Sequence, residues 1–370
     1  MTVPPLDGIR VIDMGRWIAA PYCAMILADL GADVVKIESP AGDPSRHEGP
    51  YLDGESLYFA QMNRNKRGLT LDLRTDSGLE RLHEEVREAD ILIENFRPGV
   101  LEQIGLGPED LPRVNPRCIV ARVSGFGQQS PLRESSAFDC ILQSMSGLAA
   151  INGQEEDFPL LVGSYIVDVA TAMSTAVGCL AALHERECGG RVTSVETTLL
   201  DSALALLGPW VAAAAANGTD PARAGNIDRT SAPANAYRAR DGWVYIHAGP
   251  DNFWRRILKV LGREDLLGDE RFATEDARIE NRADADAVIA SWAAERDAAE
   301  IERILADAGV PGAKVNTITE ALADPRLAIA ERVVGVTGRQ GRELPTLLAP
   351  VRMGKDAPSV RTGLPALGAD

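Results

Sequence analysis

Asp168 has surroundings that suggest chemistry more than those of any other residue in this sequence. It lies in Val162-Gly163-Ser164-Tyr165-Ile166-Val167-Asp168-Val169-Ala170-Thr171-Ala172-Met173, a stretch with no other charged residue. The small, apolar run at 177–183 predicts a buried helix. A carboxylate in such a place loses hydration, so it needs polar partners or a chemical role. Aspartate is also a favoured N-cap, and capping this helix is the plain alternative.

Basic residues in three loops suggest an anionic ligand. The loops are Gly42-Asp43-Pro44-Ser45-Arg46, Asn63-Arg64-Asn65-Lys66-Arg67 and Glu94-Asn95-Phe96-Arg97-Pro98-Gly99, each beside a predicted strand end. Ligands of open α/β sheets bind at strand ends, and arginine and lysine there suit phosphates. A single cluster of this kind is more often a solvated turn, but three of them in one acidic chain favour ligand contact.

Composition and charge exclude several classes of protein. The net charge of -16 argues against a nucleic-acid-binding protein and against binding to an anionic membrane surface. The first five residues lack the basic and apolar regions of a signal peptide, and no apolar run has membrane-spanning length. The five cysteines form no CxxC pair and are expected to be reduced thiols. We therefore expect a cytoplasmic protein.

Common cofactor and metal motifs are missing from the sequence. There is no Walker sequence, no GxGxxG after the first predicted strand and no GxSxG elbow. The four histidines have no paired-ligand spacing. We expect no metal and no permanently bound cofactor.

The first third of the chain alternates strand and helix patterns. Strands are predicted at 9–14, 33–37, 69–73, 90–93 and 118–123, and helices at 20–30 and 76–89. This rhythm predicts a Rossmann-like α/β domain with a parallel sheet. Long helices are then predicted at 138–148, 167–187 and 198–216.

A smaller α+β domain is predicted at 217–325, after a turn-like stretch at 218–221. Its strands are expected at 243–246 and 310–315, and its helices at 252–261, 282–293 and 298–308. The large domain then comprises 1–216, and 326–370 returns to it.

Six separated motifs follow one another along the chain. They are Pro5-Leu6-Asp7-Gly8-Ile9-Arg10-Val11-Ile12-Asp13, Leu27-Ala28-Asp29-Leu30-Gly31-Ala32-Asp33-Val34-Val35-Lys36-Ile37-Glu38, Asn63-Arg64-Asn65-Lys66-Arg67-Gly68-Leu69-Thr70-Leu71-Asp72-Leu73, Glu94-Asn95-Phe96-Arg97-Pro98-Gly99, Ser124-Gly125-Phe126-Gly127 and the Asp168 helix. In this order they resemble the class III CoA-transferases. This superfamily of formyl-CoA and carnitine CoA-transferases also contains α-methylacyl-CoA racemases.

The resemblance implies that Asp168 is a nucleophile. In these enzymes the matching carboxylate attacks an acyl-CoA thioester, giving an aspartyl-acyl anhydride and CoA thiolate. The thiolate then attacks the aspartyl carbonyl to give an aspartyl-CoA thioester, and an acceptor acid reverses the sequence. The substrates would be an acyl-CoA and a small carboxylic acid, in a site that excludes water. The resemblance also implies an interlocked homodimer.

Contacts to CoA carry over from the family residue by residue. The resemblance assigns them to Ile18, Ala19, Arg46, Arg64, Lys66, Asn95, Phe96, Arg97 and Phe138. Ser39 and Gln103 stand where the family often has basic residues. The glycine-rich lid of the family has a less glycine-rich counterpart here, Ala248-Gly249-Pro250.

The residue before Asp139 separates two chemistries within the superfamily. Racemases carry a His-Asp pair there, and the histidine works with the helix aspartate as a two-base system. This chain reads Ala137-Phe138-Asp139, and phenylalanine cannot move a proton. CoA transfer is therefore favoured, with Asp139 interpreted as a cap or polar anchor. The alternatives are a racemase or epimerase, and a non-catalytic acyl-CoA-binding homologue.

Overall fold

The computed structural model describes residues 3–353 and 359–368, and the chain forms two compact units. The first unit comprises Met1–Leu148, Leu161–Thr219 and Ala330–Asp370. The second comprises Ala149–Leu160 and Asp220–Ile329. The sequence-based boundaries placed Ala149–Leu160 in the large domain, whereas this segment clusters with the second unit.

A six-stranded parallel sheet forms the centre of the first unit, as predicted. Its order is β5-β2-β1-β6-β7-β8. The strands are β1 (Arg10–Asp13), β2 (Asp33–Glu38), β5 (Lys66–Thr70), β6 (Ile91–Glu94), β7 (Ile119–Ser124) and β8 (Ser194–Thr198). The strand order reverses between β1 and β6, and ligands of doubly wound folds bind at the carboxyl ends of the strands at such a point.

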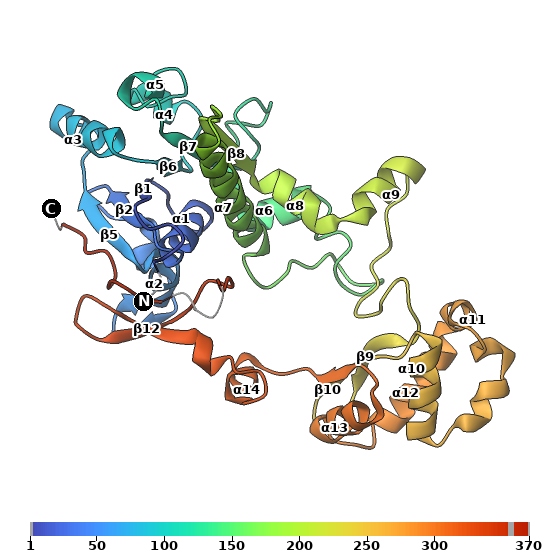
Figure 1. Cartoon of the computed structure of the whole chain (residues 1–370). Coiled ribbons are helices and arrows are strands. Elements are labelled where there is room, and N and C mark those ends of the chain that lie inside the picture. The colour runs from blue at the N-terminus through green and yellow to red at the C-terminus, as the bar shows by residue number, and fades with distance from the viewer. Residues whose placement is uncertain (1–2, 354–358, 369–370) are drawn as a thin grey trace. The chain divides into compact units, whose positions relative to one another are not determined.

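Helices cover both faces of this sheet (Figure 1). Alternate strand residues point to opposite faces, so Val11 packs with α1 (Ala19–Asp29) and α7 (Ile166–Glu187), whereas Ile12 packs with α3 (Asp76–Arg87). Among the helices of the described residues, α7 is the one long and apolar enough to cross a membrane, a property that core helices share. Its buried residues pack against α1 and the sheet.

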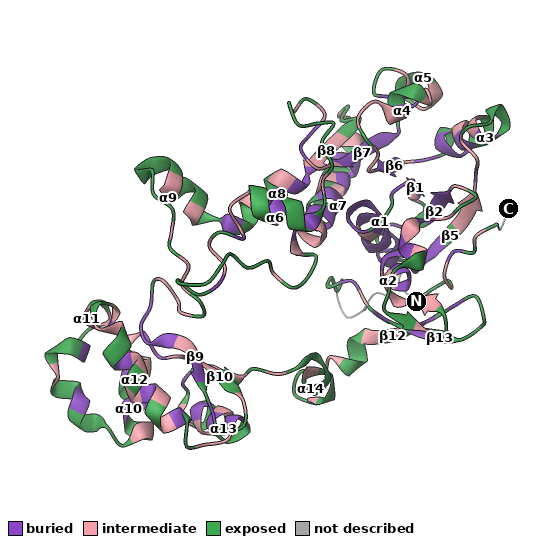
Figure 2. Ribbon diagram, turned by 180° about the vertical axis from the view of Figure 1, so that it is seen from behind, coloured by how far each residue is buried: buried purple, intermediate pink, exposed green. Residues whose placement is uncertain are grey.

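The remaining elements of the first unit include two short hairpins and several helices. They are β3 (Tyr51–Leu52), β4 (Glu55–Ser56), α2 (Leu57–Asn63), α4 (Val100–Gln103), α5 (Leu111–Val114), α6 (Asp139–Met145), α8 (Leu199–Leu207), α9 (Pro209–Asn217), β12 (Val333–Thr337) and β13 (Glu343–Leu347). The helix predicted at 198–216 is broken into α8 and α9 by Gly208, at φ 55, followed by a proline. None of the residues of α9 is buried (Figure 2).

The second unit is built on an antiparallel sheet of β9 (Ala234–Arg238), β10 (Trp243–His247) and β11 (Gly312–Lys314). Its helices are α10 (Asp251–Leu261), α11 (Glu275–Glu280), α12 (Arg282–Ala293), α13 (Ala298–Ala308) and α14 (Ile318–Ala323). The buried Arg278 donates to the carbonyl of Gly249 over 2.5 Å and to Asp251 over 2.6 Å. A Cβ on Gly249 would lie 1.8 Å from the Ser231 hydroxyl, so only glycine fits in this loop.

Candidate active site

Asp168 lies in the first turn of α7, where two hollows of the first unit meet. One hollow, of about 250 Å³, follows the ends of the sheet strands, and we call it the strand-end hollow. The other, of about 520 Å³, contains two tyrosines, and we call it the tyrosine hollow. Trp17, Ile18, Phe138 and Asp168 line both. A group bound at Asp168 can therefore extend in two directions.

The strand-end hollow brings together most of the residues that the resemblance assigns to CoA. It lies past the carboxyl ends of β1, β6 and β7, where the switch point of the sheet predicts a ligand. The predicted residues that line it are Ile18, Ala19, Asn95, Phe96, Arg97, Phe138 and Asp168. The structure places all seven around one hollow, and their roles remain predictions.

Two exposed arginines lie at this edge of the sheet. Asn95 fixes the loop after β1, because its side chain accepts from the Arg16 amide over 2.9 Å and donates to the Arg16 carbonyl over 2.8 Å. The Arg16 guanidinium lies 5.6 Å from the centre of the Phe96 ring. Arg97 donates to the Ser136 hydroxyl over 3.4 Å. Within the described residues neither arginine forms an ion pair with a carboxylate, so both can meet an anion.

The tyrosine hollow is lined mainly by aromatic, apolar and acidic residues. Tyr58 and Tyr165 form an edge-to-face pair with ring centres 5.6 Å apart. Glu48 and Asp139 also line the hollow, and its lining residues include no lysine, arginine or histidine. Burial raises the pKa of Tyr58, and the neighbouring Tyr165 and Asp168 raise it further. Tyr58 therefore stays protonated at neutral pH and can donate a hydrogen bond.

Asp139, not Asp168, caps the helix that carries the candidate nucleophile. Its Oδ2 accepts from the amides of Val167 over 2.7 Å and Asp168 over 3.1 Å. Its Oδ1 accepts from Gln143 over 2.5 Å. The N-cap residue, Tyr165, makes no side-chain cap. The interpretation of Asp139 as a cap is confirmed, and the capping alternative for Asp168 is wrong because these amides already have an acceptor.

The carboxylate of Asp168 differs from that of Asp139 in its surroundings. Burial raises its pKa to about 7, and the nearby charge of Asp139 adds to the effect. Within the described residues its carboxylate oxygens have no hydrogen-bond or ion-pair partner. It is therefore a basic carboxylate that no internal cation neutralises, which is the state expected of a reacting group.

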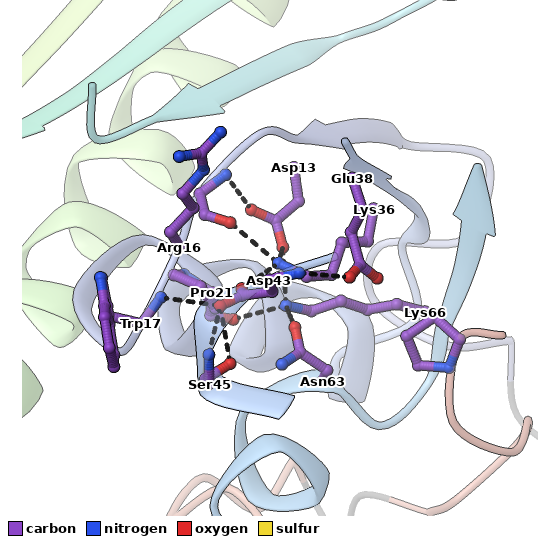
Figure 3. A network of polar contacts seen from close by, with 12 residues as sticks. Asp13, Arg16, Trp17, Pro21, Lys36, Glu38, Asp43, Ser45, Asn63 and Lys66 are labelled. Atoms are coloured by element: carbon purple, nitrogen blue, oxygen red, sulfur yellow. Dashed lines mark hydrogen bonds and ion pairs between the residues drawn. The ribbon is translucent and has the colours of Figure 1, made fainter. Parts of the chain in front are cut away.

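The structure does not bring Arg46, Arg64 and Lys66 to either hollow. Each is bound to a carboxylate inside the protein: Arg46 to Glu38 over 2.5 Å, Arg64 to Asp29 over 2.7 Å and Lys66 to Asp13 over 2.7 Å. The side chains of Arg64 and Lys66 are completely buried. Figure 3 shows Lys66 among its partners. We therefore withdraw the predicted phosphate contacts of these three cations.

The position of the second basic loop explains this correction. Lys66 begins β5, whereas the sequence pattern placed the strand at 69–73. Arg64 and Asn65 precede the strand, and Lys66 and Arg67 are its first residues, so all four lie at its amino end. Ligands of open sheets bind past the carboxyl ends. Arg64 and Asn65 share the carboxylate of Asp29 over 2.7 and 2.9 Å, and the Asn65 side chain also holds the returning C-terminal segment at Ser359 and Arg361.

Sequence reasoning missed three aromatic residues that line the site: Trp17, Tyr58 and Tyr165. Trp17 offered a signal, because it lies in the loop after the first strand, at the edge where ligands bind. The two tyrosines offered none, because they approach each other only through the fold. The described residues contain no group of three or more histidine, cysteine, aspartate or glutamate side chains placed to hold a metal ion.

Comparisons with known proteins agree with this geometry. The chain is 38% identical to the succinyl-CoA–D-citramalate CoA-transferase of Chloroflexus aurantiacus, over 90% of this chain and 83% of that protein. It is 36% identical to the succinyl-CoA:mesaconate CoA-transferase of Haloarcula hispanica, over 96% of this chain and 91% of the relative. A crystal structure of a CAIB/BAIF family protein from Brucella suis matches with a TM-score of 0.87 and 32% identity, covering 99% of this chain and 97% of that one.

The family model of CoA-transferase family III matches residues 6–370. Together with the sheet, the two hollows and the free carboxylate between them, this match shows that the chain belongs to CoA-transferase family III.

Proposed function

We propose that this CoA-transferase moves CoA from an acyl-CoA to a carboxylic acid through covalent intermediates on Asp168. One observation carries the proposal: Asp168 is a basic carboxylate at the junction of two hollows, and its oxygens have no hydrogen-bond or ion-pair partner in the part of the chain that the structure describes. A structural aspartate at a helix start would be used as a cap, and here Asp139 fills that role. Asp168 is thereby free to react.

The reaction would begin with attack by an Asp168 carboxylate oxygen on the thioester carbonyl. The carbon–sulfur bond breaks, CoA leaves as a thiolate, and an aspartyl-acyl anhydride remains. The thiolate then attacks the aspartyl carbonyl and expels the donor acid as a carboxylate. The carboxylate of the acceptor acid attacks the resulting aspartyl-CoA thioester and expels the CoA thiolate, leaving a second anhydride. The thiolate attacks the acyl carbonyl of the acceptor, which forms the new thioester and releases the Asp168 carboxylate. No proton needs to be transferred in these steps, which suits a site whose shared walls carry no histidine.

The raised pKa of Asp168 has two opposing consequences for this chemistry. A more basic carboxylate is a stronger nucleophile once it is ionised, and the low hydration that raises its pKa also protects an anhydride from water. Below pH 7 the protonated form accumulates, and this form cannot attack. CoA transfer should therefore increase as the pH rises through about 7.

The two hollows suggest how the substrate is divided. The strand-end hollow, with Arg97 at its edge, suits the CoA arm, and the tyrosine hollow suits the acyl group. A further hollow of about 430 Å³ lies at the ends of β1, β2 and β5 and includes Arg16, Arg74 and Phe96. CoA can extend from Asp168 past Arg97 and Arg16 to this third hollow.

Relatives named for D-citramalate, mesaconate and L-malate suggest succinyl-CoA as donor and a four- or five-carbon dicarboxylic acid as acceptor. The lining residues of the tyrosine hollow supply no cation, so a second carboxylate would need a partner from outside that set. We further propose a cytoplasmic homodimer. The exposed apolar residues Met173 and Val177 on α7 support an interface with a second copy.

A screen with trapping tests the function. Purified protein is incubated with succinyl-CoA and single carboxylic acids, and the CoA esters are identified by mass spectrometry. Hydroxylamine is then added during turnover, and peptides are mapped. We expect a new CoA ester and a hydroxamate on the peptide that holds Asp168. Adduct formation on another residue, or binding of CoA without transfer to any acid, would contradict the proposal.

A further inference from the structure

Trp17 has a backbone conformation that is unusual for its size. Its φ is 66°, in the left-handed region that favours glycine, and its side chain is 36% exposed. A bulky residue pays a conformational cost there, and such a residue persists only when its surroundings hold it. We therefore look for the contacts that hold Trp17 in this conformation and for a function that its side chain serves.

Four buried charges supply the restraint (Figure 3). Lys66 lies 2.7 Å from Asp13, and Lys36 lies 3.0 Å from Asp43 and 3.8 Å from Asp13. All four side chains are at most 1% exposed. Two positive and two negative charges offset one another, so the group can remain ionised inside the protein. We call these four residues the charge cluster.

The contacts of the charge cluster converge on the loop that carries Trp17. Asp13 accepts from the Gly15 amide over 2.8 Å, and Lys36 donates to the Gly15 carbonyl over 2.8 Å. The Trp17 amide donates to Asp43 over 3.4 Å. A Cβ on Gly15 would lie 2.5 Å from the Cβ of Ala20, so the loop can approach α1 this closely only with glycine at this position. Trp17 is thus held at its own amide and through Gly15.

The held side chain stands between the two hollows. Trp17 lines both the strand-end hollow and the tyrosine hollow, with Phe138 and Asp168 as further shared residues. We propose that Trp17 is a specificity-determining residue that separates the acyl group from the CoA arm, and that the charge cluster positions it. This inference rests on the proposed function, because that function assigns the CoA arm to one hollow and the acyl group to the other.

The chemical consequence is a limit on the acyl chain. An indole between the hollows confines the acyl group to the tyrosine side, so a straight chain long enough to run toward the strand-end hollow meets the indole and is disfavoured. Replacing it with glycine removes the wall and also removes the backbone cost, since glycine adopts positive φ freely. The variant is therefore expected to fold at least as well as the wild type while losing selectivity.

The test compares wild type with Trp17→Gly by measuring acyl-CoA affinity and transfer. Calorimetry gives Kd for CoA, acetyl-CoA and octanoyl-CoA in the Asp168→Asn background, where turnover is blocked. Transfer from succinyl-CoA is measured with straight-chain acids from acetate to octanoate. In Trp17→Gly, the ratio of octanoyl-CoA to acetyl-CoA affinity should rise about tenfold or more. Any change in the contact between the indole and the CoA arm affects both esters alike and cancels in this ratio, and the Kd of CoA alone measures that change. An unchanged ratio in a folded variant would overturn the proposal.

Ala328→Gly is the matched control, because Ala328 also has a positive φ, of 49°, without lining either hollow. It should leave the affinity ratio unchanged; a similar rise there would trace the effect to backbone relaxation and overturn the proposal. If transfer is absent with every acid, the proposed function fails, whereas the affinity ratio still decides the role of Trp17.

Asp43→Asn tests the positioning role of the charge cluster. In the same Asp168→Asn background, it should raise the affinity ratio when Trp17 is present and add nothing to Trp17→Gly, since the cluster acts through the indole. Effects that add in the double variant would show that Asp43 does not position Trp17. Should Asp43→Asn fail to fold, Ser45→Ala takes its place in the same cycle, because it removes the hydroxyl that donates to Asp43 over 2.8 Å and keeps the amide that donates over 2.9 Å.

Discussion

Asp13 and Asp168 are carboxylates of one unit with opposite surroundings, Asp13 buried and Asp168 half-buried. Asp13 is fully buried and meets Lys66 at 2.7 Å, Lys36 at 3.8 Å and the Gly15 amide at 2.8 Å. Among the described residues no cation pairs with Asp168. Burial raises its pKa, and the charge of another carboxylate, Asp139, raises it further. A carboxylate that the fold has neutralised supports structure, whereas one left basic and accessible can react.

Asp168→Asn should produce the largest loss of activity. An amide cannot form the anhydride, so kcat for CoA transfer should fall by about 10⁴-fold or more. Because the raised pKa means that folding binds a proton, ionisation of Asp168 reduces stability as the pH rises from about 4 to about 7. Asparagine does not ionise, so the variant avoids this loss of stability. Its Tm at pH 7 or above should not be lower than that of the wild type.

Turnover by Asp168→Asn, after deamidation has been excluded by mass spectrometry, would remove Asp168 from the mechanism. A large drop in Tm at pH 8 would instead place Asp168 with the structural carboxylates such as Asp13.

Lys66→Met should produce the largest loss of stability. It leaves Asp13 without its nearest cation in a fully buried place, and breaking such a pair costs about 3–5 kcal/mol in the free energy of unfolding. The matched control is Arg67→Met, because Arg67 is the next residue and pairs with Asp33 at the surface over 2.7 Å. That change should cost under about 1 kcal/mol. Urea unfolding gives the free energy of unfolding of both variants. Equal losses of this free energy in the two variants would refute the structural role of Lys66.

Asp139→Asn should shift the pH dependence of activity. Wild-type kcat/KM should rise as Asp168 loses its proton near pH 7. Asparagine keeps an acceptor for the Val167 and Asp168 amides but removes the charge, so the rise should move to lower pH. The shift should be partial, because burial is the larger cause of the raised pKa. A profile that does not move would show that Asp139 acts as a cap alone.

Arg97→Ala should have the smallest of these effects, on CoA affinity. Its side chain is exposed at the strand-end hollow, so losing one contact to a phosphate should raise the Kd of CoA about fivefold. Arg67→Met removes the same charge from a pair outside the hollow and should leave Kd unchanged. The Arg97 effect should weaken as salt is added. Calorimetry that gives equal Kd values for both variants would place the phosphates elsewhere.

The sequence by itself determined much of the α/β architecture. Strands such as β1 and β6 are short apolar runs, and α1 and α7 have long apolar patterns, so local periodicity was enough to predict them. It did not predict β8, whose residues Ser194–Thr198 are mostly polar. This strand exists because its backbone pairs with β7, and such pairing leaves no local signal.

Some features of the candidate site were likewise predictable from the sequence, and others depend on the fold. Asp168 was predictable because a lone charge in an apolar helix pattern is visible in the sequence. Which cations are free was not predictable, because Arg97 and Lys66 look alike until the fold gives Lys66 a buried partner and leaves Arg97 exposed. Asp139 and Asp168 are separated by 29 residues, and only tertiary packing places the carboxylate of one on the amide of the other. Ionisation depends on such neighbours, so the reactivity of Asp168 is a property of the folded structure.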